Sequence, residues 1–110
     1  MIYEFRTYEA APGRLSDLDG RFRDLTTRVF ARHGFTPVGF WTAADPDRVV
    51  YLLGWQDAAE QKAKWAEFGA DPEWLAGKAA SEENGPLVAR ITTETWQPAS
   101  YSPLGPGAGR

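Results

Sequence analysis

The segment Val49-Val-Tyr-Leu-Leu-Gly-Trp55 decides how this 110-residue chain folds, because it is a short apolar run with two apolar faces. Successive side chains of a β-strand point to opposite sides. One side of this segment carries Val49, Tyr51, Leu53 and Trp55, and the other carries Val50, Leu52 and Gly54. Both sides need a cover, so the strand is expected inside a sheet that is shielded on both faces.

Strand and helix patterns surround this segment. Residues 2–8, 37–42 and 87–96 are expected to form three more strands. Between residues 14 and 33, apolar side chains recur at intervals of three and four, which is typical of one amphipathic helix. Gly34 follows this stretch, where a residue with positive φ often ends a helix.

Two aspartates mark the starts of further helices. Asp57-Ala-Ala-Glu60 is a variant of the capping box, in which the Asp side chain accepts from a backbone amide of the first turn. The helix that it begins is expected to reach about Phe68. Asp71-Pro72 predicts a second, short helix with Asp as its cap and Pro at its first position.

The order strand, helix, strand, strand, helix, strand predicts an α+β, ferredoxin-like βαββαβ fold. In this fold, helices cover one face of a four-stranded antiparallel sheet whose first strand is central. Residues 1–97 are expected to form this single domain. Residues 98–110 are rich in Pro and Gly and are expected to form a tail outside the core.

Composition excludes several classes of function. The chain has no Cys and one His, which argues against disulfides, thiol nucleophiles and metal sites built from cysteines or several histidines. We expect neither a metal nor a cofactor. Its net charge of −3 argues against a nucleic-acid partner. No apolar run has the ~20 residues of a membrane span, and Glu4 and Glu9 interrupt any signal peptide. We therefore expect a cytoplasmic protein.

The two-faced strand also predicts a homodimer. Two helices cover only one face of such a sheet, and a chain of this length has little left to cover the other. A second copy, packed sheet to sheet about a two-fold axis, is the simplest cover. The alternative is a monomer in which Tyr51 and Trp55 are ordinary half-exposed aromatic side chains.

Several segments resemble the NIPSNAP family, and together they span residues 2–104. They are Ile2-Tyr-Glu-Phe-Arg-Thr-Tyr8, Pro12-Gly13, Arg32-His-Gly34, Val38-Gly-Phe-Trp41, Asp71-Pro-Glu-Trp74 and Ser102-Pro-Leu104. The resemblance implies a dimeric α+β barrel, whose two sheets pack face to face around a cavity. Tyr51 stands where the family often carries His. Relatives in this group include cofactor-independent monooxygenases, decarboxylases, cyclases, isomerases and plain binders, so the resemblance selects no reaction.

Glu4, Arg6 and Tyr8 share one face of the first strand and are the first candidates for chemistry. Burying a carboxylate and a guanidinium is costly unless they are paired. In one interpretation this face lines the dimer cavity, where Arg6 binds an anionic oxygen and Glu4 is a general base with a pKa raised by desolvation. In the other, an Arg6–Glu4 or Arg6–Glu94 ion pair only fixes the register.

His33 is the remaining catalytic candidate, because an imidazole titrates near neutral pH. It is either an acid–base residue at the mouth of the cavity or a partly exposed ring at a helix C-terminus, where a cation is favoured. Three aromatic side chains, Trp41, Tyr51 and Trp55, are candidates for binding a flat hydrophobic ligand together with Tyr8. The alternative role for these aromatic residues is in the core.

Three functions stay open from the sequence. The first is a cofactor-independent enzyme that acts on a small hydrophobic or aromatic molecule by proton transfer, cyclisation, isomerisation or monooxygenation. The second is a non-catalytic binder of such a molecule. The third is a protein-interaction module that uses the C-terminal tail.

Overall fold

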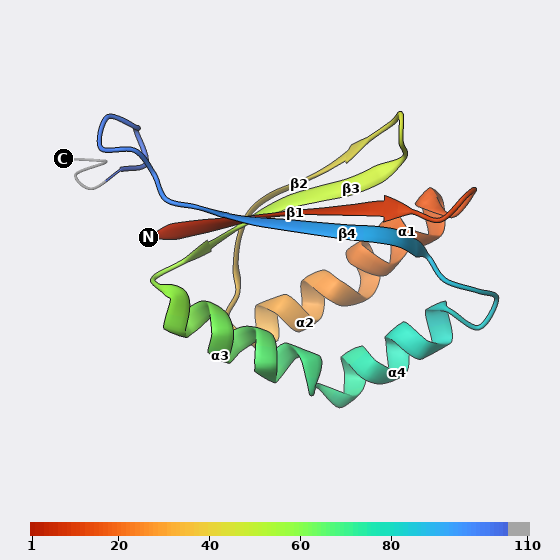
Figure 1. Ribbon diagram of the computed structural model, residues 1–110. Coiled ribbons are helices and arrows are strands. Elements are labelled where there is room, and N and C mark those ends of the chain that lie inside the picture. Colours follow the sequence, from red (N-terminus) through yellow and green to blue (C-terminus); the bar gives the residue numbers. More distant parts are fainter. Residues whose placement is uncertain (106–110) are drawn as a thin grey trace.

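The computed structural model describes residues 1–105, and its sheet is the predicted four-stranded antiparallel one (Figure 1). The strands are β1 (Ile2–Ala10), β2 (Thr36–Ala43), β3 (Arg48–Trp55) and β4 (Val88–Trp96). Their order across the sheet is β2-β3-β1-β4, so β1 and β3 are central and β2 and β4 are the edges. The helices of the described chain lie on one face of this sheet, which confirms the ferredoxin-like fold (Figure 1).

The first helical stretch contains a wider turn in its middle. It runs through α1 (Leu15–Arg21), the π-helical turn η1 (Phe22–Thr26) and α2 (Thr27–Arg32). The buried Thr26 hydroxyl donates to the Arg21 carbonyl at 3.4 Å across this turn. The sequence predicts one regular helix here, because apolar residues at intervals of three and four continue from Leu15 to Val29. Such turns often occur beside functional residues.

The two predicted aspartate caps are confirmed. Asp57 precedes α3 (Ala58–Gly69) and accepts from the Glu60 amide at 2.9 Å, while Glu60 accepts from the Gln56 amide at 3.0 Å. Asp71 precedes α4 (Pro72–Ser81) and accepts from the Glu73 and Trp74 amides. None of the helices in residues 1–105 has the length and apolarity needed to cross a bilayer.

The core lies between the sheet and the helices and is dominated by aromatic rings. Phe30 of α2 is at its centre: its ring stacks on Phe35 at 4.5 Å and contacts Phe68, Trp65 and Tyr51 at 5.1, 5.8 and 5.9 Å between centroids. The buried hydrophobic residues are Leu18, Phe22, Val29, Phe30, Phe35, Val49, Tyr51, Leu53, Trp55, Phe68 and Leu87. They join the helix layer to the central strands.

Within residues 1–105, no helix covers the opposite face of the sheet (Figure 1). In the register of the strands, Phe5 pairs with Leu52 and Thr7 with Val50, and these side chains are only half-buried. Trp41 and Trp96 are 52% and 44% exposed, and Phe5 stacks on Trp96 with centroids 4.9 Å apart. We call this surface the open face. It carries the second apolar side of the Val49–Trp55 segment.

After β4 the chain leaves the sheet at the end where the N-terminus lies (Figure 1). The Ser102 amide donates to the Ala99 carbonyl, and the Gly105 amide donates to the Ser102 carbonyl, each at 2.9 Å. Tyr101 is 91% exposed. The predicted tail of residues 98–110 is therefore described only in part, since residues 106–110 lie outside the described chain.

Phe30→Ala should lower the free energy of unfolding by about 3–5 kcal/mol, because it leaves a cavity among four aromatic rings. Urea denaturation at one fixed protein concentration measures this change. Tyr101→Ala is the control, and its effect should stay within about 0.5 kcal/mol because the ring is exposed. A loss below about 1 kcal/mol for Phe30→Ala would contradict its central place in the core.

Candidate functional site

A buried carboxylate lies in the layer between the sheet and the helices. Glu4 of β1 is 4% exposed. Its Oε1 accepts from the indole N–H groups of Trp55 and Trp65 at 2.9 and 2.8 Å and from the Gln61 amide at 3.0 Å. Its Oε2 accepts from Arg6 Nη1 at 2.8 Å. Four donors from β1, β3 and α3 therefore satisfy this one group.

These donors determine the charge of Glu4. Burial alone would raise the pKa of its carboxyl, but the hydrogen bonds from Trp65, Gln61 and Arg6 outweigh burial and lower that pKa. Glu4 is thus an ionised carboxylate with three donors on Oε1 and one on Oε2. The condition for its predicted role as general base, a raised pKa, is not met.

Arg6 connects this carboxylate to two phenols. Its Nη2 donates to the Tyr8 oxygen at 3.0 Å, and its guanidinium lies over the Trp65 ring at 4.4 Å from the centroid. The Tyr51 hydroxyl donates to the same Tyr8 oxygen at 3.2 Å. Burial and the neighbouring Tyr8 raise the pKa of Tyr51, so that Tyr51 stays protonated. With two donors on its oxygen, Tyr8 keeps its own proton free to donate.

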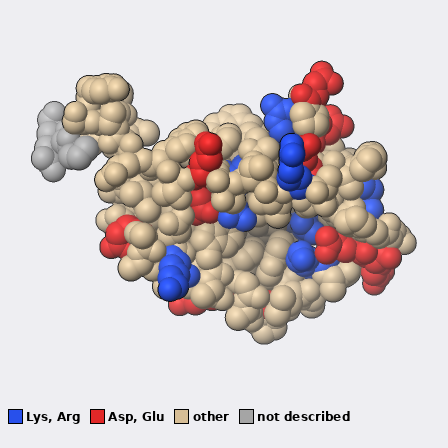
Figure 2. Space-filling model, viewed as in Figure 1, with Lys and Arg blue, Asp and Glu red and all other residues tan. Residues whose placement is uncertain are grey.

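Tyr8 forms part of the wall of a pocket of about 410 Å³ between β4 and α4. We call it the β4–α4 pocket. Figure 2 shows the surface hollowed between these elements, with Lys and Arg side chains beside the hollow. Its other lining residues are Arg21, Trp74, Lys78, Glu82, Val88, Ala89, Arg90 and Ile91. Arg21 and Lys78 share the one acidic group Glu82, while Arg90 is paired with Glu9, so the pocket has a positive wall with an apolar part.

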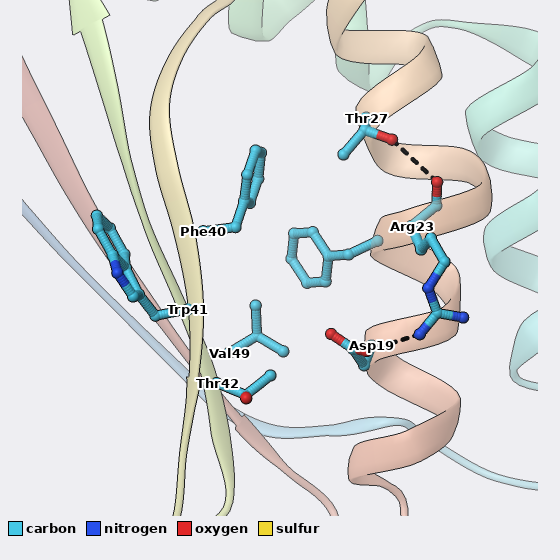
Figure 3. Close-up of a pocket in the computed structure, with 8 residues that line it drawn as sticks. Asp19, Arg23, Thr27, Phe40, Trp41, Thr42 and Val49 are labelled. Atoms are coloured by element: carbon cyan, nitrogen blue, oxygen red, sulfur yellow. Dashed lines mark hydrogen bonds and ion pairs between the residues drawn. The ribbon is translucent and has the colours of Figure 1, made fainter.

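The predicted ligand-binding residue Trp41 lies elsewhere. It borders a groove of about 350 Å³ between β2 and the first helical stretch, together with Phe40, Val49 and the Asp19–Arg23 ion pair. Figure 3 shows Phe40 and Val49 on the helix side of β2, with Trp41 on the other side. Trp41 therefore belongs mainly to the open face.

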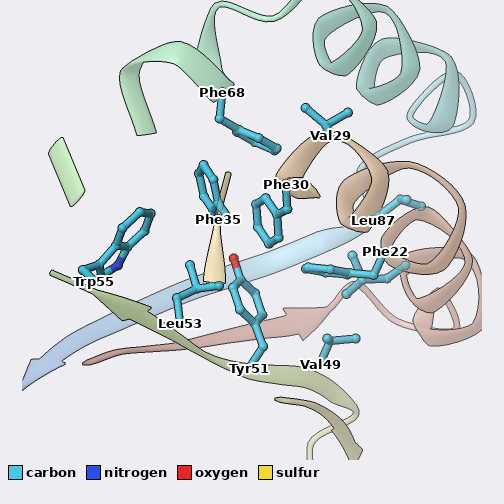
Figure 4. Packing of buried hydrophobic residues seen from close by; sticks show 11 residues of the cluster. Phe22, Val29, Phe30, Phe35, Val49, Tyr51, Leu53, Trp55, Phe68 and Leu87 are labelled. Atoms are coloured by element: carbon cyan, nitrogen blue, oxygen red, sulfur yellow. The ribbon is translucent and has the colours of Figure 1, made fainter. Parts of the chain in front are cut away.

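Tyr51 and Trp55, also predicted to bind a ligand, lie in the core (Figure 4). Their side chains are 0% and 1% exposed. Each donates one hydrogen bond to a polar residue of β1: the Tyr51 hydroxyl to Tyr8, and the Trp55 indole to Glu4. Of the predicted ligand-binding residues, Tyr8 is the one that meets the β4–α4 pocket.

The structure corrects the expected direction of the face that carries Glu4, Arg6 and Tyr8. This face points at the helices and not at the open face, because Glu4 accepts from Gln61 and Trp65 of α3. The predicted Arg6–Glu4 ion pair is confirmed at 2.8 Å. The alternative Arg6–Glu94 pair is wrong, since the register places Glu94 opposite Phe5, on the open face.

His33 belongs to a different cluster. Its Nε2 is 2.7 Å from Asp71 Oδ2, and its Nδ1 is 3.8 Å from a Glu67 carboxylate oxygen. Arg32 Nη2 donates to the same Asp71 oxygen at 2.6 Å. These contacts tie the end of α2 to the junction of α3 and α4. Neither the hydrogen bonds nor the ion pairs of the described residues join His33 to the Glu4–Arg6 cluster.

Four residues of this region are not predicted as site residues from the sequence: Gln61, Trp65, Arg21 and Trp74. Gln61 and Trp65 are four residues apart on α3, so both project from one side of that helix. This spacing is the signal that could have found them. Arg21 and Trp74 lie on different helices, and nothing local in the sequence joins them.

Glu4→Gln should lower the free energy of unfolding by about 3 kcal/mol at neutral pH, because it leaves Arg6 buried without a counterion. Urea denaturation followed by tryptophan fluorescence measures this loss. Glu83→Gln is the control, because Glu83 is an exposed carboxylate in the turn after α4 and lies outside the open face. Its effect should stay below about 1 kcal/mol.

The difference in unfolding free energy between wild type and Glu4→Gln should depend on pH. The folded-state pKa of Glu4 is lowered, so its ionised form stabilises the fold above its usual pKa of 4.5. This contribution disappears as pH falls through the folded-state pKa. The difference in stability between wild type and Glu4→Gln should therefore shrink below pH 4.5. A difference that stays constant in acid would contradict an ionised Glu4.

Comparison with known proteins shows how this chain is related to others. The NIPSNAP family model matches residues 3–103. A NIPSNAP family protein with unknown function from Agrobacterium tumefaciens is 23% identical, with 94% of this chain and 93% of that chain covered and a TM-score of 0.80. An uncharacterized NIPSNAP-like domain protein from Burkholderia xenovorans is 23% identical, with 96% and 90% covered and a TM-score of 0.79.

A putative antibiotic biosynthesis monooxygenase from Nitrosomonas europaea is more distant, at 11% identity, with 89% of this chain and 98% of that chain covered and a TM-score of 0.63. These structures share the fold of this chain, and at such identities they carry no more than the fold. No curated protein matches the sequence. Because the family model covers almost the whole described chain, this protein belongs to the NIPSNAP family.

Proposed function

We propose that this protein binds a small molecule with a hydrophobic or aromatic body in the β4–α4 pocket. The observation that carries the proposal is that Tyr8 lines the pocket while its hydroxyl oxygen accepts from Arg6 and Tyr51. A hydroxyl held in this way has a fixed position and one free proton. It can donate a hydrogen bond to an oxygen of the ligand.

The size and walls of the pocket support such a ligand. A volume of about 410 Å³ lies within the range of small-molecule sites. Trp74 and Ile91 offer apolar surface, while Tyr8 and the basic side chains supply a few polar groups at defined places. Apolar walls with few convergent polar groups are typical of ligand pockets.

Binding is favoured over the enzymatic alternative because Glu4 is buried and its lowered pKa makes it a weak base for proton abstraction. Its four hydrogen bonds and lowered pKa make it a structural anion. His33 pairs with Asp71 and contributes to a helix junction. The two candidate acid–base residues thus have structural partners, whereas Tyr8 is available to a ligand.

We also propose that the working unit is a homodimer paired through the open face. The apolar side of β3 that carries Val50 and Leu52 is half-buried in one chain, and Trp41 and Trp96 are 52% and 44% exposed beside it. A second copy packed on this face would remove these rings from water. The β4–α4 pocket lies on the helix side, so such a dimer leaves it open.

Titration with 2-naphthol tests the ligand proposal. Of the five tryptophans, Trp74 lines the β4–α4 pocket, and Trp41 lines the groove beside β2. In ¹H–¹⁵N spectra the Trp74 indole resonance should shift first, and Tyr8→Phe should weaken binding about tenfold. Tyr3→Phe, which removes a hydroxyl from the open face, should leave the affinity unchanged. Shifts confined to Trp41, or none at all, would contradict the proposal.

Light scattering coupled to gel filtration tests the dimer. Wild type at micromolar concentration should give twice the 12.2 kDa mass of one chain. Leu52→Glu should shift it towards the monomer, because it places a charge in the open face. Leu75→Glu is the control, since Leu75 lies on α4 and is 52% exposed. A wild-type mass of 12.2 kDa would refute the dimer.

A further inference from the structure

Arg21, the last residue of α1, is a buried cation beside the β4–α4 pocket. Only 4% of its side chain is exposed. Its guanidinium lies 5.5 Å from the centroid of the Trp74 ring and lines the same pocket as Tyr8. The π-turn η1 begins at the next residue, Phe22. The Arg21 side chain therefore extends from the end of α1 and contacts Trp74 and Ser81 of α4.

The partners of Arg21 are too few for a buried guanidinium. One of its donors, Nη1, reaches Ser81 Oγ at 3.2 Å, and the Glu82 carboxylate is 3.7 Å away, beyond hydrogen-bond distance. Its Nε is buried without a hydrogen-bond partner. Arg6 also has a buried Nε without a partner, but its other nitrogens have a carboxylate at 2.8 Å and a phenol at 3.0 Å. A guanidinium carries five donors, so Arg21 has donors to spare.

The surroundings of Arg21 are also positive. Burial lowers its pKa, and the nearby Glu82 compensates only in part. Lys78 shares that same carboxylate at 3.7 Å, and Arg90 pairs with Glu9 at 2.7 Å. In the pocket, the single carboxylate of Glu82 thus lies 3.7 Å from each of two cations, Arg21 and Lys78. An anionic group from outside would complete this charge balance.

We propose that the ligand of the β4–α4 pocket is an aromatic or hydrophobic carboxylate, and that Arg21 determines this specificity. The proposal rests on the proposed function and names the chemical class of its ligand. The planar carboxylate meets the free donors of the Arg21 fork, and Tyr8 donates to the same group. The hydrophobic body lies against Trp74 and Ile91. No covalent step is involved.

A neutral ligand of the same shape is then at a disadvantage. An amide in place of the carboxylate presents an N–H₂ group to a guanidinium that can only donate, so one contact becomes repulsive. The buried charge of Arg21 stays without a counterion at hydrogen-bond distance. Discrimination by an unsatisfied buried group exceeds what apolar contact alone provides.

The test compares 2-naphthoate with 2-naphthamide, which have the same ring system and nearly the same shape. Both are titrated into the full-length wild-type protein at low salt, and the Trp74 indole resonance reports binding. We expect 2-naphthoate to bind at least about tenfold more tightly. Equal affinities would overturn the role of Arg21 and leave the proposed function standing. If neither probe nor 2-naphthol shifts the Trp74 resonance, the proposed function itself fails.

Variants then assign the preference to one side chain. Arg21→Gln should reduce the ratio of the two affinities to about one, as this change removes the cation. Arg23→Gln is the matched control two residues away, because Arg23 is 65% exposed and pairs with Asp19. It should keep the wild-type ratio. A folded Arg21→Gln protein that keeps this ratio would overturn the assignment.

The rim cations provide a second test that does not depend on how Arg21→Gln folds. The side chains of Lys78 and Arg90 are 48% and 70% exposed, so Lys78→Gln and Arg90→Gln should both fold normally. Each should lower the affinity for 2-naphthoate less than threefold, because an exposed charge is screened by solvent. A rim variant that abolishes the preference would show that the rim, and not Arg21, selects the carboxylate.

Discussion

The rest of the structure depends on the satisfaction of one buried carboxylate. Glu4 lies on the central strand β1 and receives hydrogen bonds from β1, β3 and α3. A carboxylate in this position without donors would cost several kcal/mol. The helix α3 must therefore pack on the sheet in a position and orientation that bring Gln61 and Trp65 within hydrogen-bond distance of Glu4. This requirement positions the helix layer as firmly as the apolar contacts around Phe30.

The same constraint reaches the pocket through a short chain of contacts. Arg6 bridges Glu4 and Tyr8 and lies over the Trp65 ring, so the two ends of the cluster are held together. Tyr8, which is hydrogen-bonded to Arg6, lines the β4–α4 pocket. There Arg21 stands as a second buried cation with fewer partners. One guanidinium thus serves the fold, and the other is the group that we propose to bind the ligand.

Much of the fold could be predicted because its signals are local. The strands, the caps at Asp57 and Asp71 and the element order follow from polarity patterns and turn chemistry within a few residues. The pairing of Glu4 with Arg6 was also foreseeable, since side chains two apart share a strand face. The candidate site was predicted less well. Alternation separates two faces but does not say which face the helices cover, so the sequence left open whether Glu4, Arg6 and Tyr8 line a dimer cavity or pair within the chain.

By itself, the sequence determined the order of strands and helices, the two-faced character of β3 and membership of the NIPSNAP family. Only the tertiary structure decided that Tyr8 and Arg21 share a pocket, that Tyr51 and Trp55 are core residues and that His33 belongs to a helix junction. The reason is physical. Local propensities act over one or two turns of chain, whereas a site is assembled by the packing of helices and strands that are far apart in sequence.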